Sequence, residues 1–127
     1  MSKKIIKTER APLPIGPYNQ AVCVNNFIFT AGQIALDPAT GAIIAGGVEE
    51  QTRCVLGYVR SIIEAAGSSM TKIVKATIFL KDMNDFPKVN KVYTEFFQAE
   101  SAPARSTIEV ARLPKDALVE IEVIAYI

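Results

Sequence analysis

The residues best suited to chemistry in this chain are an arginine and a glutamate near its C-terminal end. Arg105 lies in the sequence Pro103-Ala104-Arg105-Ser106, and Glu120 lies in the alternating segment that closes the chain. Arginine binds small carboxylates well because its planar guanidinium donates two parallel hydrogen bonds. A glutamate in a partly dry cleft can hold a water molecule or exchange a proton. On pattern alone, however, each residue is also typical of a solvent-exposed strand.

The absence of histidine limits the chemistry that these residues could support. The sequence has no histidine, which excludes His-based triads, His general bases and His-ligated metal sites. Its two cysteines, Cys23 and Cys54, are too few for a thiolate zinc site. They are typical of a reducing compartment, and we expect both to be buried as small apolar residues. Any reaction must therefore use carboxylates, Arg, Lys, Tyr, hydroxyl groups or the backbone.

Length and composition indicate one globular domain, residues 1–127. Half of the residues are hydrophobic, yet no apolar stretch approaches the roughly 20 residues of a membrane-spanning helix. The formal charge is only +1, and the basic residues are dispersed apart from Lys3, Lys4, Lys7 and Arg10. This balance does not favour nucleic acid as a partner, because phosphate binding usually needs a clear basic excess. The N-terminus lacks the apolar segment of a secretory signal, so we expect a cytoplasmic protein.

The periodicity of apolar residues predicts the elements that carry these groups. Residues 21–24 and 27–30 flank Asn25-Asn26 and predict a hairpin, and Ile5-Ile6 predicts a strand before it. A helix is expected over residues 48–66, with acidic residues in its first turn and Gly67 after its end. A second helix follows Asn84 or Asp85 as its cap, with Pro87 in its first turn. Further strands are predicted over 73–81, 107–110 and 118–127, with a turn at 113–116.

This order of elements predicts an α+β fold. About six strands and two long helices can bury their apolar faces in one mixed sheet with both helices packed on one face. In the final strand the residues alternate between two faces. One face holds Val119, Ile121, Val123 and Ala125, and the other holds Leu118, Glu120, Glu122, Ile124 and Tyr126. Carboxylates that alternate with Leu and Ile are ordinary on a solvated sheet face, yet this face is unusually apolar for one that meets only water. If a partner subunit covers it, one of the glutamates could line a partly dry cleft.

Several short stretches, taken together, resemble the Rid (reactive intermediate deaminase) family, and the RidA subgroup, also called the YjgF family, in particular. They are Ile15-Gly16-Pro17-Tyr18, Ala31-Gly32-Gln33-Ile34, Val74-Lys75-Ala76-Thr77 and the run PARSTIEVARLPKDALVEIEVIA over 103–125. The resemblance covers residues 5–126 with the motifs in order. It implies a chorismate-mutase-like fold, a homotrimer with ligand sites in the clefts between subunits, and no cofactor.

The activity that this resemblance implies is hydrolysis of 2-iminobutanoate and 2-iminopropanoate to 2-oxo acids and ammonia. These imines are released by pyridoxal-phosphate dehydratases. Residue by residue, it implies that Arg105 binds the substrate carboxylate and that Glu120 positions the attacking water. It also implies a pocket lined by Tyr18, with backbone contacts from Gly32 and Thr107.

Four further positions bear on the expected site. Phe86 and Asn90 match positions at the pocket rim. Ala31 stands where RidA proteins usually have Ser, and Thr107 stands where they usually have Cys. If these two positions act through backbone groups, activity should survive. The alternative is a small-carboxylate-binding regulatory or protein-interaction protein with little catalysis, in translation inhibition, an RNA-related role or chaperoning.

Overall fold

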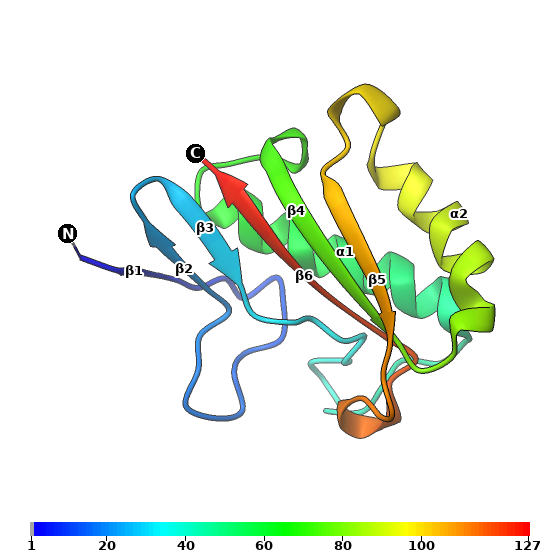
Figure 1. The fold of residues 1–127 in the computed structure, drawn as a ribbon. Coiled ribbons are helices and arrows are strands. Elements are labelled where there is room, and N and C mark those ends of the chain that lie inside the picture. Colours follow the sequence, from blue (N-terminus) through cyan, green and yellow to red (C-terminus); the bar gives the residue numbers. More distant parts are fainter. Residues whose placement is uncertain (1) are drawn as a thin grey trace.

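The computed structural model describes residues 2–127, and within them a six-stranded sheet carries two long helices on one face (Figure 1). The helices are α1 (Val48–Ala65) and α2 (Phe86–Phe96). The strands are β1 (Lys4–Ile6), β2 (Ala21–Val24), β3 (Phe27–Thr30), β4 (Ile73–Leu80), β5 (Ala104–Glu109) and β6 (Val119–Tyr126). Their order in the sheet is β1-β2-β3-β6-β4-β5, with β4 and β5 parallel and all other neighbours antiparallel. The predicted α+β layer architecture is therefore confirmed.

The hairpin between β2 and β3 forms as predicted. Asn25 and Asn26 adopt φ angles of 52° and 63°, the left-handed conformation that a two-residue turn between antiparallel strands requires. Asparagine tolerates this conformation better than most residues because its short polar side chain bonds locally. The turn also receives the C-terminus, since the Ile127 amide donates to the carbonyl of Asn26 at 2.9 Å.

Helix α1 has a sequence-encoded signal at each end. At its start the Glu50 carboxylate accepts a hydrogen bond of 2.6 Å from the Gly47 amide. At its end Gly67 adopts φ +87°, and the amides of Gly67 and Ser68 donate back to the carbonyls of Glu64 and Ile63. The predicted helix over 48–66 is thus confirmed to within one residue.

Helix α2 has Asp85 at its N-cap position, one of the two predicted caps. The Asp85 side chain, however, makes no capping hydrogen bond. Instead, the Asp82 carboxylate accepts from the Asn84 amide at 2.9 Å and begins a short 3₁₀ turn, Met83–Asp85, that leads into the helix. Pro87 lies in the first helical turn, where its missing N–H costs nothing.

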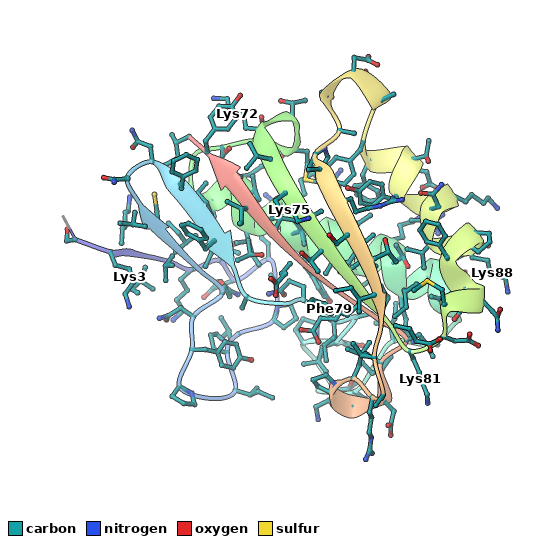
Figure 2. All side chains as sticks on the ribbon, viewed as in Figure 1. Lys3, Lys72, Lys75, Phe79, Lys81 and Lys88 are labelled. Atoms are coloured by element: carbon teal, nitrogen blue, oxygen red, sulfur yellow. The ribbon has the colours of Figure 1, made fainter. Side chains whose placement is uncertain are left out.

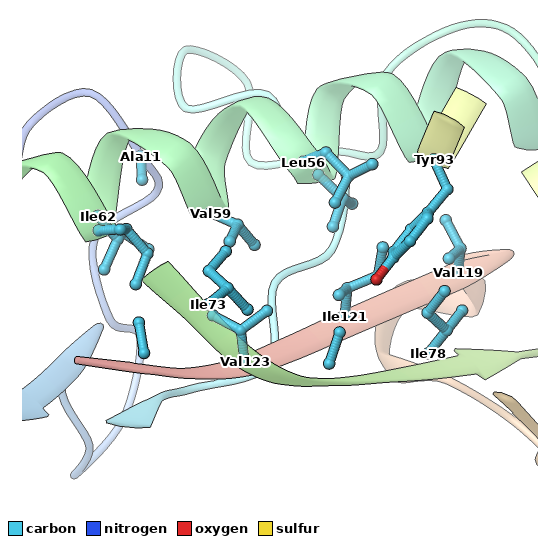
Figure 3. Packing of buried hydrophobic residues seen from close by; sticks show 14 of the residues in the cluster. Ala11, Leu56, Val59, Ile62, Ile73, Ile78, Tyr93, Val119, Ile121 and Val123 are labelled. Carbon is cyan, nitrogen blue, oxygen red and sulfur yellow. The ribbon is translucent and has the colours of Figure 1, made fainter. Parts of the chain in front are cut away.

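The hydrophobic core lies between the helices and one face of the sheet. Figure 3 shows α1 laying Leu56, Val59 and Ile62 over this face, while Tyr93 reaches in from α2. The strands contribute alternate residues, so that Val119, Ile121, Val123 and Ala125 of β6 are all buried, as predicted. Adjacent to β6, β4 contributes Ala76 and Ile78 to the same layer.

The opposite face of the sheet is uncovered in the single chain. Phe27, Phe29, Ile108 and Tyr126 are each between 40% and 45% exposed. Cross-strand pairing puts Phe79 and Lys75 on this face as well, and Figure 2 labels both in front of the strands. We call this surface the open face.

Three details differ from the sequence prediction. Strand β5 begins at Ala104 rather than at residue 107, because its parallel pairing with β4 already starts at the pair Lys75–Ala104. The strands predicted over 73–81 and 118–127 are each shorter by one or two residues, at Ile73–Leu80 and Val119–Tyr126. Cys23 is buried as expected, whereas Cys54 is only partly buried.

Tyr93 has a hydroxyl group that the core leaves without a hydrogen-bond partner among residues 2–127. Replacing Tyr93 with Phe should therefore raise the free energy of unfolding by about 1 kcal/mol, because burying an unpaired hydroxyl is costly. Urea denaturation at fixed protein concentration measures this difference. Tyr18→Phe, which removes the hydroxyl of an exposed tyrosine, is the control and should change stability little. A destabilised Tyr93→Phe protein would contradict the prediction.

Candidate functional site

A cavity of about 420 Å³ opens beside the first half of β6. Four of the residues predicted from the sequence line it together: Tyr18, Ala31, Gly32 and Glu120. The remaining lining is mostly apolar and comes from the loop before β2, the segment after β3 and the turn before β6: Pro12, Leu13, Ile15, Gln20, Gln33, Ile34, Leu36, Pro114 and Lys115. A concave, largely apolar site with a few polar groups is the usual form of a small-molecule site.

The loop that forms one wall of the cavity is held by a buried glutamine. The amide nitrogen of Gln20 donates to the carbonyls of Thr8, Ala11 and Pro12, and its oxygen accepts from the Thr8 amide. These bonds hold the chain around residues 8–12 against the start of β2. Tyr18 then reaches the cavity half exposed, and its hydroxyl accepts a long hydrogen bond of 3.4 Å from the Ile15 amide.

Glu120 supplies the acidic group of the cavity. It pairs across the sheet with Phe79 and so projects from the open face of β6. Burial raises the pKa of Glu120 above that of an ordinary glutamate, and the neighbouring carboxylate of Glu122 raises it further. The raised pKa gives the Glu120 carboxylate a higher affinity for a proton, and this makes it a better acceptor of a proton from water.

Gly32 allows the Glu120 carboxylate to occupy this position. A Cβ atom added to Gly32 would overlap the carboxylate oxygen Oε2 and would lie 2.8 Å from Cδ of the same side chain. The backbone of the next residue is fixed to β6 by two hydrogen bonds, Gln33 N–H to Ile121 O at 2.9 Å and Ile121 N–H to Gln33 O at 3.1 Å. A side chain at residue 32 would therefore displace the Glu120 carboxylate, which lies directly against the glycine Cα.

Arg105 lies elsewhere in the chain, between β5 and α2. Its guanidinium donates to the Asn90 side-chain oxygen at 2.9 Å. It also stacks over two rings, with Cζ 4.7 Å from the Tyr93 centroid and 5.3 Å from the Phe86 centroid. Phe86 and Asn90 therefore hold Arg105, and they do not line the cavity that contains Glu120.

Sheet register shows that Arg105 and Glu120 project from opposite faces. Arg105 pairs with Ala76, whose side chain is fully buried beneath the helices, whereas Glu120 pairs with Phe79 on the open face. Cross-strand partners share a face, whereas Ala76 and Phe79, three residues apart on β4, lie on opposite faces of the sheet. Thr107 pairs with the buried Ile78 and thus accompanies Arg105. The predicted site residues consequently form two separate groups in one chain.

Sequence reasoning missed two residues of these groups. Tyr93 was given no role in the expected site, yet the centroid of its ring lies closer to the Arg105 guanidinium than that of Phe86 does. The spacing of Tyr93 from Asn90, three residues along the same helix, is the signal that could have identified it. Gln33 lay within a quoted motif but was given no role, and it lines the cavity.

Within residues 2–127, His, Cys, Asp and Glu side chains form no group of three placed to hold a metal ion. Over the same described part of the chain, neither helix is long and apolar enough to cross a membrane.

Comparison with known proteins identifies the family. Residues 8–127 match the family model described as Endoribonuclease L-PSP. A RutC family protein of Pyrococcus abyssi is 56% identical, with 99% of this chain and 98% of the relative covered. A protein of Salmonella typhimurium named 2-iminobutanoate/2-iminopropanoate deaminase is 52% identical, with 96% of each chain covered.

The fold comparison agrees with these sequence matches. The crystal structure of YyfA from Yersinia pestis, described as a conserved Rid family protein of unknown function, has a TM-score of 0.95 and 46% identity. The alignment covers 99% of this chain and all of that one. The similarity therefore extends over nearly the whole fold, including β5, β6 and α2. The chain therefore belongs to the Rid family, also called the YjgF family, whose family model carries the L-PSP name.

Proposed function

We propose that this protein hydrolyses small 2-imino acids, such as 2-iminobutanoate and 2-iminopropanoate, to 2-oxo acids and ammonia. The observation that carries the proposal is the half-buried Glu120 carboxylate, with its raised pKa, at the wall of a mostly apolar cavity. The deaminase name of the Salmonella typhimurium relative supports the same reaction. Two unpaired cysteines are consistent with action in the cytoplasm.

The complete site requires a second copy of the chain. Arg105 and Glu120 face opposite sides of one sheet, so the carboxylate anchor and the water-positioning group cannot meet on one substrate molecule within one subunit. The open face offers an assembly surface, because its exposed Phe27, Phe29 and Tyr126 form an apolar area flanked by polar residues. We propose the homotrimer that the family resemblance implies, with Arg105 of one subunit facing Glu120 of its neighbour.

The mechanism follows from these two groups. Arg105 binds the substrate carboxylate through two parallel hydrogen bonds and so orients the imine carbon. Glu120 accepts a hydrogen bond from a water molecule and takes its proton as the water oxygen bonds to C2. Glu120 then returns this proton to the nitrogen, which gives the carbinolamine. The hydroxyl group on C2 next gives its proton to Glu120, which passes it to the departing nitrogen, so that the C2–N bond breaks, ammonia leaves and the 2-oxo acid remains. Backbone groups near Thr107 are available to contact the imine nitrogen.

Asn90, Phe86 and Tyr93 serve Arg105 rather than the substrate in this mechanism. Their hydrogen bond and ring stacking hold the guanidinium plane on the helix side of β5. An arginine that is already oriented loses less rotational freedom when the ligand binds. Ala31 lines the cavity without a hydroxyl group, so any hydrogen bond from a serine at that position is lost in this chain.

The alternative is a carboxylate-binding protein with little turnover, and Ala31 and Thr107 are the residues that favour it. The purified protein can be mixed with a threonine dehydratase and threonine while semicarbazide traps the remaining imine. Faster loss of the imine supports the enzyme. Unchanged loss together with bound 2-oxobutanoate supports the binder. A dedicated RNA-cleaving role has less support, since the net charge is only +1 and no histidine is present.

A mixing experiment tests whether the site lies between copies. Arg105→Ala and Glu120→Gln should each abolish imine hydrolysis while leaving the assembly intact. Refolding the two variants together in equal amounts should restore about a quarter of the wild-type activity. Each site between copies has a chance of about one half of receiving an intact Arg105 and, independently, of about one half of receiving an intact Glu120. Persistent inactivity in verified mixed assemblies would refute a site between copies. Arg105→Lys should also be poor, since an ammonium keeps the charge but lacks the planar fork.

Substituting Gly32 tests the position of the Glu120 carboxylate. Gly32→Ala should lower the rate of hydrolysis by about 10- to 100-fold, because the added methyl group displaces the carboxylate. Binding of 2-oxobutanoate, measured by calorimetry, should change much less, since Arg105 provides the anchor. Gly57→Ala is the matched control, because a Cβ at Gly57 meets nothing within 4 Å. An undiminished rate in Gly32→Ala would show that this contact is not needed.

The pH dependence of the rate tests the ionisation of Glu120. The reactive form is the carboxylate, so activity should be lost as pH falls through the raised pKa of Glu120. Glu122→Gln removes one cause of that rise, lowers the pKa of Glu120 and should move the acidic limb to lower pH. Rate profiles of both proteins measure this shift. An acidic limb that moves to higher pH, or does not move, would contradict the assignment.

A further inference from the structure

Gln20 connects the sheet to the loop that precedes β2. Its main chain is fixed, because its carbonyl accepts a hydrogen bond of 2.8 Å from the Ala31 amide and so continues the pairing of β2 with β3 beyond the pair Ala21–Thr30. Its side chain is buried, with 2% of the residue exposed. Within the described chain, every hydrogen bond between residues 8–19 and the sheet is made by this side chain.

The Gln20 carboxamide takes the place of a neighbouring strand. The pairing of β1 with β2 ends at Ile6–Ala21, and the chain then turns away from β2. Oε1 of Gln20 accepts from the Thr8 amide at 2.8 Å, and Nε2 donates to the Thr8 carbonyl at 3.0 Å. Nε2 also donates to the carbonyls of Ala11 at 3.2 Å and Pro12 at 2.8 Å. A carboxamide supplies one acceptor and two N–H donors, so its hydrogen-bonding capacity is fully used here.

Packing holds the rest of this loop only weakly. Leu13, Ile15 and Tyr18 are 50%, 75% and 49% exposed. A further cavity of about 410 Å³ borders the loop, and Leu13 and Ile15 line this cavity as well as the one that holds Glu120. A segment that is exposed and bordered by cavities has few contacts to fix its position. The hydrogen bonds of Gln20 are therefore the main polar restraint on the loop.

The position of the loop affects the Glu120 carboxylate. Glu120 shares its cavity with four residues of the loop: Pro12, Leu13, Ile15 and Tyr18. Burial is the first cause of the raised pKa of Glu120, and the Glu122 carboxylate on the same face of β6 is the second. The other ionisable groups of the cavity lining are the Tyr18 phenol and the Lys115 amine.

We propose that Gln20 is a positioning residue, whose carboxamide holds the wall formed by residues 12–18 beside the Glu120 carboxylate and thereby limits the access of bulk water to the cavity. Three carbonyls bound by one buried amide fix the base of this wall, and the pairing of Gln20 with Ala31 fixes the amide to the sheet. The contribution of Gln20 to catalysis rests on the proposed function, whereas its effect on the carboxylate does not.

Direct titration of Glu120 tests this role without turnover. The chemical shift of its carboxyl ¹³C nucleus, assigned by the loss of the signal in Glu120→Gln, follows ionisation in the assembled protein. Gln20→Met keeps the side-chain length but removes the amide, so water should enter and the pKa of Glu120 should fall toward that of an ordinary glutamate. The acidic limb of the rate profile should then move to lower pH as well.

Ligand affinity gives a second measurement on the same variant. Binding of 2-oxobutanoate to Gln20→Met, measured by calorimetry, should weaken about tenfold if the wall is in place in about a tenth of the molecules. Gln20→Asn keeps the amide on a side chain one methylene shorter, which cannot reach all three carbonyls. It should shift the titration and the affinity in the same directions, and it repeats the test should Gln20→Met not assemble.

Ile63→Val is the control for a general loss of stability. Ile63 is fully buried in α1 and does not line the cavity. This substitution should lower the melting temperature and leave both the Glu120 titration and the 2-oxobutanoate affinity unchanged. Equal shifts in Ile63→Val and Gln20→Met would mean a structural role and would overturn the proposal. So would an unshifted titration in assembled Gln20→Met, or failure of both Gln20 variants to assemble.

The outcomes separate this inference from the proposed function. If the wild type hydrolyses the imine and the Glu120 titration is the same in Gln20→Met, the inference about Gln20 fails alone. If the titration shifts as expected but the wild type neither hydrolyses the imine nor binds 2-oxobutanoate, the proposed function fails while the role of Gln20 in positioning the wall stands.

Discussion

The alternation of β6 is the constraint on which the rest of the structure depends. This strand lies between β3 and β4, and each side chain that it buries under α1 obliges the next one to project from the open face. Val119 and Ile121 enter the core, so Glu120 between them must leave it. The acidic group of the site is thus a direct consequence of core packing, and a shift of one residue in register would bury the carboxylate.

The cavity lies where the pairing between β3 and β6 ends. Beyond Thr30 the pairing with β6 is reduced to the bridge between Gln33 and Ile121, so the first half of β6 lacks a full neighbouring strand on that side. The gap that this leaves is lined by apolar side chains and by the Glu120 carboxylate, which packs against Gly32. Burial in this place raises the pKa of Glu120, because a carboxylate gives up hydration that the cavity does not replace.

The cation of the proposed site belongs to a different structural unit. Arg105 is held by Asn90, Phe86 and Tyr93, three residues of α2 that follow one face of that helix. Each half of the site is therefore built locally, one by β6 and its neighbours and one by β5 and α2. Because the sheet separates the two halves, catalysis as we propose it depends on assembly. Loss of the interface would then remove activity without unfolding either half.

Much of this protein follows from local sequence. Alternation of apolar residues determined which face of β6 is buried, and the consecutive asparagines and Gly67 determined the hairpin turn and the end of α1, since these features depend on residues close in the chain. The family motifs identified Arg105 and Glu120. Only the tertiary structure decided that the two side chains lie on opposite faces and that Asn90 and Phe86 serve the arginine. These facts depend on strand order and on contacts between distant segments, which periodicity along one segment does not encode.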